Sequence, residues 1–394
     1  MNKKYIPFLL LILLPFFVSG QNLSLSEDAE ISILTIGPGD NLSDAFGHNA
    51  FRIRDNAIGL DVIYDYGRYD FETPNFYLKF ARGKLLYEVG TNNFLPFLNY
   101  YKRQDRWVKE QLLTLTSEEK TKLFSFLQNN AKPENKKYEY DFFYDNCATR
   151  IRDVLQNILG ERLYFLDNHI TESYTFRELI QKNVHWNTWG SMGMDVAIGA
   201  VVDVPAKPLE YQYLPEYVYH GVANARVKTM FATAALAKDT TVIYDAPERK
   251  QKPDFFKSPV FIFSLLALII IGFTIRDMQR GMRTRAIDGL IFSITGIIGI
   301  LLFLLWFATD HSATANNYDL LWAFLFNIFV VYAITRKDPK PWVRKYVFFL
   351  ILLMVLLGIH WATGVQSFAY ALIPILVALI IRYVFLIQII PAKK

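Results

Sequence analysis

The single cysteine of this 394-residue chain, Cys147, lies in the segment "DNCATRIRD" and could act as a nucleophile. Apolar residues at helical spacing follow it, among them Ile151 and Val154, so Cys147 stands at the start of a predicted helix. Backbone N–H groups and the helix dipole at such a position stabilise a thiolate, and Arg150 and Arg152 add positive charge. A small buried residue that packs the helix against a strand is the alternative interpretation.

A thiol nucleophile needs a general base, and His48 in "FGHNAFRI" is the best-placed candidate. It begins a predicted strand, which would hold the imidazole rigidly, and the preceding glycine permits close approach. A surface histidine at a strand edge is the alternative. Asp65 or Tyr64, on the next predicted strand, could orient the ring, as could a backbone carbonyl. The other histidines before residue 250 are expected to be structural: His169, His185 and His220.

The composition limits the other kinds of chemistry. Hydrophobic residues make up 52% of the chain, with 32 Phe and 23 Tyr, which excludes a disordered protein. The net charge of +5 is not gathered into one basic stripe, so no nucleic-acid partner is expected. The sequence has no cluster of His, Cys and carboxylate residues at metal-ligand spacing, and one cysteine cannot build a thiolate zinc site. We therefore expect neither a metal nor a cofactor.

Residues 1–20 are typical of a secretory signal peptide, with two lysines, an apolar run over residues 6–18 and small residues at the end. A retained signal anchor is the alternative. The region that follows is expected in an oxidising compartment, where cysteines usually occur in pairs. A single cysteine there indicates an intermolecular bridge, an inert buried thiol or a reactive one.

The chain changes character at about Pro259, after which hydrophobic segments dominate. Five candidate membrane spans follow one another, at residues 260–275, 286–307, 320–335, 347–358 and 368–390. An all-α membrane domain of about five transmembrane helices is therefore expected.

The loops between these spans fix the orientation. The loops at 276–285 and 335–345 are rich in Lys and Arg, whereas the alternate loops contain neither. By the positive-inside rule the basic loops and the C-terminus are cytoplasmic, and the region before the spans lies outside. We predict a protein of the bacterial inner membrane with a periplasmic domain at 22–245, a linker at 246–258 and a membrane domain at 259–394.

The periplasmic domain is predicted to be α+β. Apolar patterns of strand type occur at residues 29–36, 48–55, 60–71 and 85–94. Helical patterns occur at 116–132, which begins with a capping box, and at 148–160, which ends on a glycine. We expect this arrangement to bring His48 and Cys147 together, although 99 positions separate them in the sequence.

A His-bearing strand that precedes a Cys-bearing helix resembles the circularly permuted papain-like superfamily of NlpC-like and lecithin–retinol acyltransferase-like (LRAT-like) enzymes. More specifically, "GHNAFRI", "YDYGRYDF", "DNCATRIRD", "TFRELI" and "GMDVAIGAVVD" together resemble the Lnb-type lipoprotein N-acyltransferases, and the membrane half with "TDHSATANNYDLLW" is similar too. The resemblance implies a thiol enzyme that takes an acyl chain from a phospholipid and passes it to the free α-amine of a diacylglyceryl-cysteine lipoprotein. It implies Cys147 as nucleophile and His48 as general base, whereas Asp65 rests on its strand position alone.

The residues that could bind substrate are Asn146, Arg150, Arg152, Asp310 and His311. The two arginines could hold a lipid phosphate, or they could be solvated helix residues and ion-pair partners of Asp153. The other two charged candidates belong to a polar loop at the outer bilayer edge, where such groups could bind lipid headgroups or the lipoprotein, or only cap helices.

Two other functions fit the same sequence. A membrane-tethered cysteine amidase or peptidase acting on cell-wall peptides would use the same Cys–His pair, and a non-enzymatic membrane sensor would need neither residue. Five spans exceed what tethering requires, which favours a substrate that lies in the bilayer.

Overall fold

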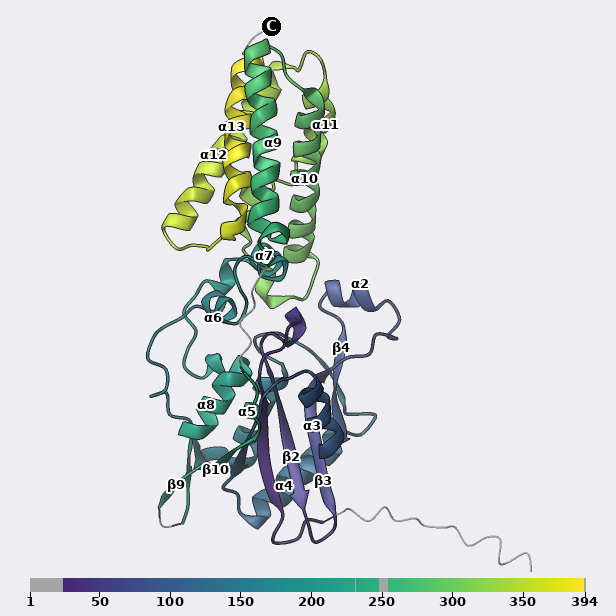
Figure 1. Cartoon of the computed structure of the whole chain (residues 1–394), viewed down its shortest axis with the longest axis vertical. Helices are drawn as coiled ribbons and strands as arrows, with labels where there is room; N and C mark the ends of the chain where they lie inside the picture. Colours follow the sequence, from purple (N-terminus) through teal and green to yellow (C-terminus); the bar gives the residue numbers. More distant parts are fainter. Residues whose placement is uncertain (1–23, 231, 248–253, 393–394) are drawn as a thin grey trace, which may run out of the picture.

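The computed structural model describes residues 24–230, 232–247 and 254–392, which form a sheet-rich part and a helical bundle lying end to end (Figure 1). The predicted signal peptide lies outside the described residues, as do residues 248–253 of the predicted linker. The chain before the bundle is α+β, as predicted.

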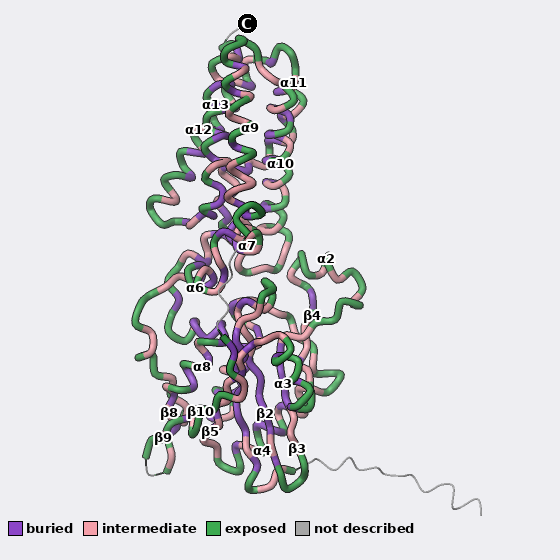
Figure 2. The backbone as a smooth tube through the Cα atoms, viewed as in Figure 1, coloured by how far each residue is buried: buried purple, intermediate pink, exposed green. Residues whose placement is uncertain are grey.

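An antiparallel sheet forms the centre of the sheet-rich part, with strand order β10-β5-β1-β2-β3-β4-β6 among the described residues. Its strands are β1 (Glu30–Ile36), β2 (His48–Asp55), β3 (Leu60–Arg68), β4 (Leu86–Asn93), β5 (Val108–Leu113), β6 (Lys137–Glu139) and β10 (Ala237–Tyr244). The first four correspond to the predicted strands. The register of β2 places Phe51 opposite Tyr64 of β3, and Figure 2 shows these central strands buried along much of their length.

Helices cover both faces of this sheet. Helix α5 (Cys147–Leu159) lies on one face, where Ile151 packs with Phe51 in a core shared with α4 (Ser117–Asn130). Helix α3 (Phe94–Arg103) covers the other face through a separate apolar cluster with β1 and β3. The His-bearing strand β2 and the Cys-bearing helix α5 are therefore direct neighbours, as the predicted arrangement requires.

The remaining elements of the sheet-rich part are α2 (Phe76–Ala81), β7 (Leu163–Tyr164), α6 (Phe176–Asn183), α7 (Trp189–Ala197), α8 (Pro215–Asn224), β8 (Arg226–Lys228) and β9 (Thr233–Ala235). Strands β7, β8 and β9 form a second small sheet. Helices α6 and α7 lie between the main sheet and the bundle (Figure 1).

Within the described part of the chain, four helices of the bundle are long and apolar enough to cross a membrane. They are α9 (Pro259–Arg280), α10 (Arg285–Phe307), α12 (Pro341–Ala362) and α13 (Ile373–Ile389). Many of their outward-facing apolar side chains are exposed, which suits contact with lipid (Figure 2).

The fifth predicted span, residues 320–335, is wrong as a continuous helix. Only α11 (Asn327–Thr335) is helical there, and its nine residues reach about 14 Å, roughly half of a bilayer core. The preceding irregular backbone packs directly on α10, because a Cβ atom at Gly299 would lie only 2.1 Å from the carbonyl oxygen of Ala323 and 2.6 Å from the backbone nitrogen of Leu325. The start of α11 packs on the same helix, where a Cβ atom at Gly296 would lie 2.5 Å from the backbone nitrogen of Ile328. Irregular backbone at membrane depth is tolerated where protein buries it in this way.

The chain nevertheless crosses the bundle in this segment. At the end near the sheet, Asp310 N–H donates to the carbonyl of Arg82 at 2.9 Å. At the far end, Arg283 in the turn between α9 and α10 donates to the carbonyl of Ile334 at 2.5 Å. The bundle therefore makes five passes, four of them as long helices among the described residues, and the cytoplasmic location of the basic loops stays a prediction.

The loop between α10 and α11 connects the bundle to the sheet-rich part through hydrogen bonds. Gly199 N–H donates to the carbonyl of Ala313 at 2.8 Å, and Asn317 Nδ2 donates to the carbonyl of Val196 at 2.8 Å. The fit leaves no room for a side chain at Gly199, where a Cβ would lie 1.9 Å from the carbonyl oxygen of Ala315.

Candidate functional site

Cys147 is the first residue of α5, and Asn146 is the N-cap that starts this helix. The Asn146 side-chain oxygen accepts hydrogen bonds from the backbone N–H groups of Ala148 and Thr149 at 2.8 and 2.9 Å. Its amide nitrogen donates to two backbone carbonyls, one of them Tyr213 at 2.8 Å. Asn146 is thus engaged in holding the helix start, and this fixes the direction of the thiol.

His48 begins β2, and its imidazole lies close enough to the Cys147 thiol that each group shifts the pKa of the other. Burial alone would raise the pKa of Cys147, but the charge and hydrogen bond of His48 and the backbone N–H of Asn49 outweigh it and lower the pKa. Burial alone would lower the pKa of His48, but the charges of Tyr101 and Cys147 and the hydrogen bond to Asp65 hold it well above its ordinary value. The two shifts favour a thiolate–imidazolium pair.

Asp65 of β3 lies on the other side of the His48 ring, with 3.4 Å between Nε2 and Oδ2. Arg68 donates to the same carboxylate, with Nε 3.1 Å from Oδ2. Burial raises the pKa of Asp65, but the hydrogen bonds from His48 and Arg68 outweigh it and keep the carboxyl ionised. Two side chains were considered for orienting His48, and Asp65 is the one that reaches it. Tyr64 instead packs against Phe124 in the core shared with α4 and α5.

A cavity of about 690 Å³ opens at the Cys147–His48 pair. Its walls are largely aromatic, formed by Tyr66, Tyr69, Phe71, Phe76, Tyr77, Phe80, Tyr87, Tyr140, Phe142, Phe143 and Tyr213. Its far side is formed by residues 310–313 of the bundle loop, so Asp310 and His311 line the same cavity as Cys147. The volume and the largely apolar lining are typical of a ligand-binding site.

The predicted arginines do not join this cavity. Arg150 pairs with Asp145 and lies 4.3 Å from the centre of the Tyr138 ring, and Arg152 pairs with Asp153 at 2.7 Å. Arg152 thus has the ion-pair partner that the sequence analysis considered, Arg150 pairs with Asp145 instead, and neither is among the described residues that line the cavity.

The polar loop residues are also held in place. Asp310 pairs with Lys84 at 3.0 Å, and His311 Nε2 lies 3.0 Å from the carbonyl oxygen of Phe80. Ser312 next to them donates to the Asp141 carboxylate at 2.5 Å. This part of the loop thus contacts both the connection between β3 and β4 and the segment before α5, and it closes the cavity between them.

The motifs "TFRELI" and "GMDVAIGAVVD" form a buried ion-pair cluster away from the thiol. Arg177 is 1% exposed and binds Asp195 at 3.1 Å and Asp203 at 2.9 Å. It also donates to the carbonyl of Ile198, and Asp203 accepts from the backbone N–H of Ser367 at 3.1 Å. Arg177 donates to the carbonyl of Gly199 as well, and Gly199 N–H binds the carbonyl of Ala313, so the cluster supports the segment that contacts the bundle loop.

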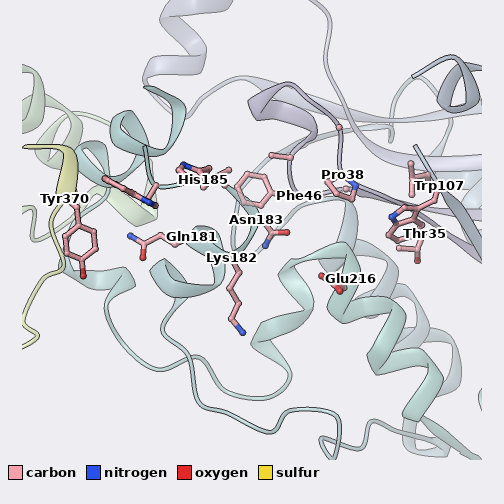
Figure 3. A pocket seen from close by; sticks show the side chains of 16 residues that line it. Thr35, Pro38, Phe46, Trp107, Gln181, Lys182, Asn183, His185, Glu216 and Tyr370 are labelled. Atoms are coloured by element: carbon pink, nitrogen blue, oxygen red, sulfur yellow. The ribbon is translucent and has the colours of Figure 1, made fainter. Parts of the chain in front are cut away.

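A second cavity of about 900 Å³ lies on the other side of Phe46 and Gly47, which line both cavities (Figure 3). Its lining includes Gln181, Lys182 and Asn183 of α6 and Glu216 of α8. Neither Cys147 nor His48 lines it, so it is not where the thiol chemistry would occur.

None of the three histidines that the sequence analysis took as structural lines the cavity at the thiol. His169 stacks on His220, with ring centres 6.3 Å apart, and His185 lines the second cavity (Figure 3). Within the described ranges no group of three or more His, Cys, Asp or Glu side chains could hold a metal ion.

Two features of the site were not anticipated. The aromatic segment between β3 and β4 supplies a cavity wall, and Arg68 reaches Asp65 because the β3–β4 pairing shifts register between these residues. The glycine in "YDYGRYDF" was the available signal, since an isolated glycine in a strand often marks a bulge. Gly67 has φ +91°, and a Cβ there would lie 3.6 Å from the Cβ of Cys147.

Comparison with known proteins gives two family matches that together cover most of the chain. The Lnb N-terminal periplasmic domain matches residues 22–182, and the Lnb transmembrane domain matches residues 250–394. Neither a curated protein nor a solved structure matches. The chain therefore belongs to the Lnb family and is a membrane protein with an N-terminal periplasmic domain.

Proposed function

We propose that this protein is a thiol-dependent N-acyltransferase that moves a fatty acyl chain from a phospholipid to the free α-amine of a diacylglyceryl-cysteine lipoprotein. The observation that carries the proposal is the cavity: the Cys147–His48 pair opens into an aromatic space whose far wall is the loop that follows a membrane helix. Membership of the Lnb family supports the same reaction class.

In the first half-reaction the Cys147 thiolate attacks the carbonyl carbon of the phospholipid ester. The tetrahedral intermediate collapses with loss of the lysophospholipid alkoxide, which takes a proton from the His48 imidazolium, and a thioester remains on Cys147. The Asp65 carboxylate stabilises the imidazolium before the proton is transferred. The backbone N–H of Cys147, which is the first residue of α5, would stabilise the oxyanion.

In the second half-reaction the neutral α-amine of the lipoprotein attacks the thioester carbonyl. The amine nitrogen gives one proton to the now neutral His48 imidazole, the C–S bond breaks, and the products are an amide and the Cys147 thiolate. The dyad returns to its starting charge state, so one acyl chain is transferred in each cycle. An amine attacks a thioester readily, which explains the choice of sulfur rather than oxygen as the carrier.

Asn146, Arg150 and Arg152 take positioning roles in this proposal instead of substrate binding. Asn146 starts α5 and thereby aims the thiol, and the two arginines are paired with neighbouring carboxylates. Asp310 and His311 remain candidates for contact with lipid headgroups, because both line the cavity at its membrane side.

A reconstituted reaction tests the proposal. Purified protein in bilayers of one defined phospholipid is mixed with a diacylglyceryl-cysteine peptide, and the peptide mass is measured. Wild type is expected to add one acyl chain of the donor lipid, and the N-acetylated peptide is expected to add none. Cleavage of cell-wall peptides without acyl transfer would favour the amidase or peptidase function. No reaction with either substrate, together with full function of a Cys147→Ser variant in cells, would favour a sensor.

A further inference from the structure

A short arm projects from the sheet beside the membrane bundle. The arm, residues 69–84, connects β3 to β4 and contains α2, which Figure 1 shows near the sheet-side end of α10. Large apolar side chains on it are unusually exposed: Tyr77 by 79%, Phe71 by 63%, Leu78 by 58% and Phe80 by 53%. Soluble surfaces rarely gather such side chains over one short segment unless something covers them.

The same arm forms a wall of the reaction cavity. Phe71, Phe76, Tyr77 and Phe80 line the space that also contains Cys147. Leu78, by contrast, is exposed and is not among the cavity-lining residues. Phe71, Tyr77 and Phe80 therefore both line the cavity and remain exposed at its rim, and Leu78 marks the outer apolar side of the arm.

Hydrogen bonds with the bundle fix the position of the arm relative to the bilayer. The carbonyl of Arg82 accepts from Asp310 N–H at 2.9 Å, and the carbonyl of Phe80 lies 3.0 Å from His311 Nε2. These partners follow the last residue of α10, Phe307, by only three and four residues, so the arm lies within about 10–14 Å of the end of a membrane helix. The polar layer of a bilayer extends about 6 Å beyond its apolar core on each side, so an arm tied this close to the end of a membrane helix is within reach of the lipid headgroups.

The charges on the arm suit this position. Lys79 lies in the last turn of α2, and Arg82 follows the helix directly. Cationic side chains beside exposed aromatic and aliphatic residues are typical of segments that lie in the membrane interface, where the cations meet lipid phosphates.

We propose that the outer side of the arm inserts into the periplasmic leaflet, and that an acyl chain of a bilayer glycerophospholipid enters the cavity between the arm and residues 310–313. This inference rests on the proposed function and names the entrance for its donor. A second copy of the chain would be the other way to cover the apolar side, and the first experiment below separates the two.

A fluorescent probe tests the insertion without reference to activity. The protein is a Leu78→Cys variant in a Cys147→Ser background, so that its single cysteine carries one NBD label. It is placed in nanodiscs that each hold one protein molecule and phospholipids with a doxyl quencher near the headgroup. We expect strong quenching at position 78 and none for the matched label at Met230, an 88% exposed residue of the β8–β9 turn. An unquenched label at position 78, or one shielded only when several copies associate in detergent, would overturn the proposal.

An activity measurement tests the entrance. With Cys147 intact, Leu78→Asp should form the Cys147 adduct from bilayer phospholipid about tenfold more slowly, because burial of a leucine side chain contributes at least this factor to partitioning. The rate with monomeric dihexanoyl phosphatidylcholine should stay within about twofold of wild type, and Met230→Asp should match wild type with both donors. Equal losses of Leu78→Asp with both donors would contradict a lipid entrance. If wild type forms no adduct with either donor, the proposed function fails, while the quenching result still decides whether the arm inserts.

Discussion

Replacing Asp65 by asparagine tests whether a carboxylate charges and orients His48. The 3.4 Å contact and the 8% exposure of the Asp65 side chain leave little water to screen the pair. Unit charges at this distance attract by about 5 kcal/mol at an effective dielectric constant of about 20. Asparagine keeps some hydrogen bonding, so we expect about half of this value to be lost, which corresponds to acylation of Cys147 that is about 10²-fold slower.

The pH dependence of thiol alkylation reports the same change without substrate. In wild type the pKa of Cys147 is lowered chiefly by His48, so iodoacetamide should react at pH values below the usual range of a thiol. The Asp65 charge by itself slightly raises the pKa of Cys147, but its loss also lowers the pKa of His48 and removes the imidazolium, which is the larger effect. The alkylation midpoint of Asp65→Asn should therefore move to higher pH.

The matched control is Asp61→Asn on the same strand. Asp61 pairs with Arg52, which keeps a second partner in Glu110, so this variant should acylate within about twofold of wild type. An Asp65→Asn variant with the wild-type alkylation midpoint and acylation rate would refute the assignment of Asp65, and another group would have to orient His48.

Three further substitutions test the framework of the site. Arg177→Met leaves two buried carboxylates without their partner and should cost about 3–5 kcal/mol in unfolding free energy, measured by thermal or denaturant unfolding, whereas Arg152→Ala should cost less than about 1 kcal/mol. Gly199→Val should displace residues 313–317 and lower acyl transfer more than it lowers the unfolding midpoint, since its side chain would overlap the backbone of that loop. Asp288→Asn should destabilise the bundle by about 3–5 kcal/mol in detergent unfolding, because Asp288 is fully buried and pairs with Arg382 at 2.7 Å; an unfolding midpoint equal to wild type would contradict this.

The sequence was informative wherever the signal is local. Alternation over residues 48–55 and helical spacing after Cys147 identify β2 and α5, and these two elements carry the candidate base and nucleophile. Asn146 could also have been identified as an N-cap rather than a ligand, since Asn directly before a helical pattern is a preferred cap.

The cavity could not be predicted, because it depends on contacts between distant segments. The arm at 69–84 and the loop at 310–313 meet through Asp310, Arg82 and His311, and no short-range pattern indicates such a pairing. The short length of α11 could not be predicted for a related reason. Hydropathy reports how apolar residues 320–335 are, but the irregular backbone there depends on the glycines of α10 against which it packs.

The most direct test of the central claim is the mass of the protein after incubation with phospholipid and no acceptor. The account predicts that wild type gains one fatty acyl chain, that neutral hydroxylamine removes it, and that the adduct maps to Cys147. His48→Ala should form the adduct at least about 10²-fold more slowly, because the thiol loses its base, and Cys147→Ala should form none. Addition of a diacylglyceryl peptide with a free amine should then discharge the adduct onto the peptide. Acyl transfer at the wild-type rate by Cys147→Ala would contradict the account, since the chain has no other thiol to carry the acyl group.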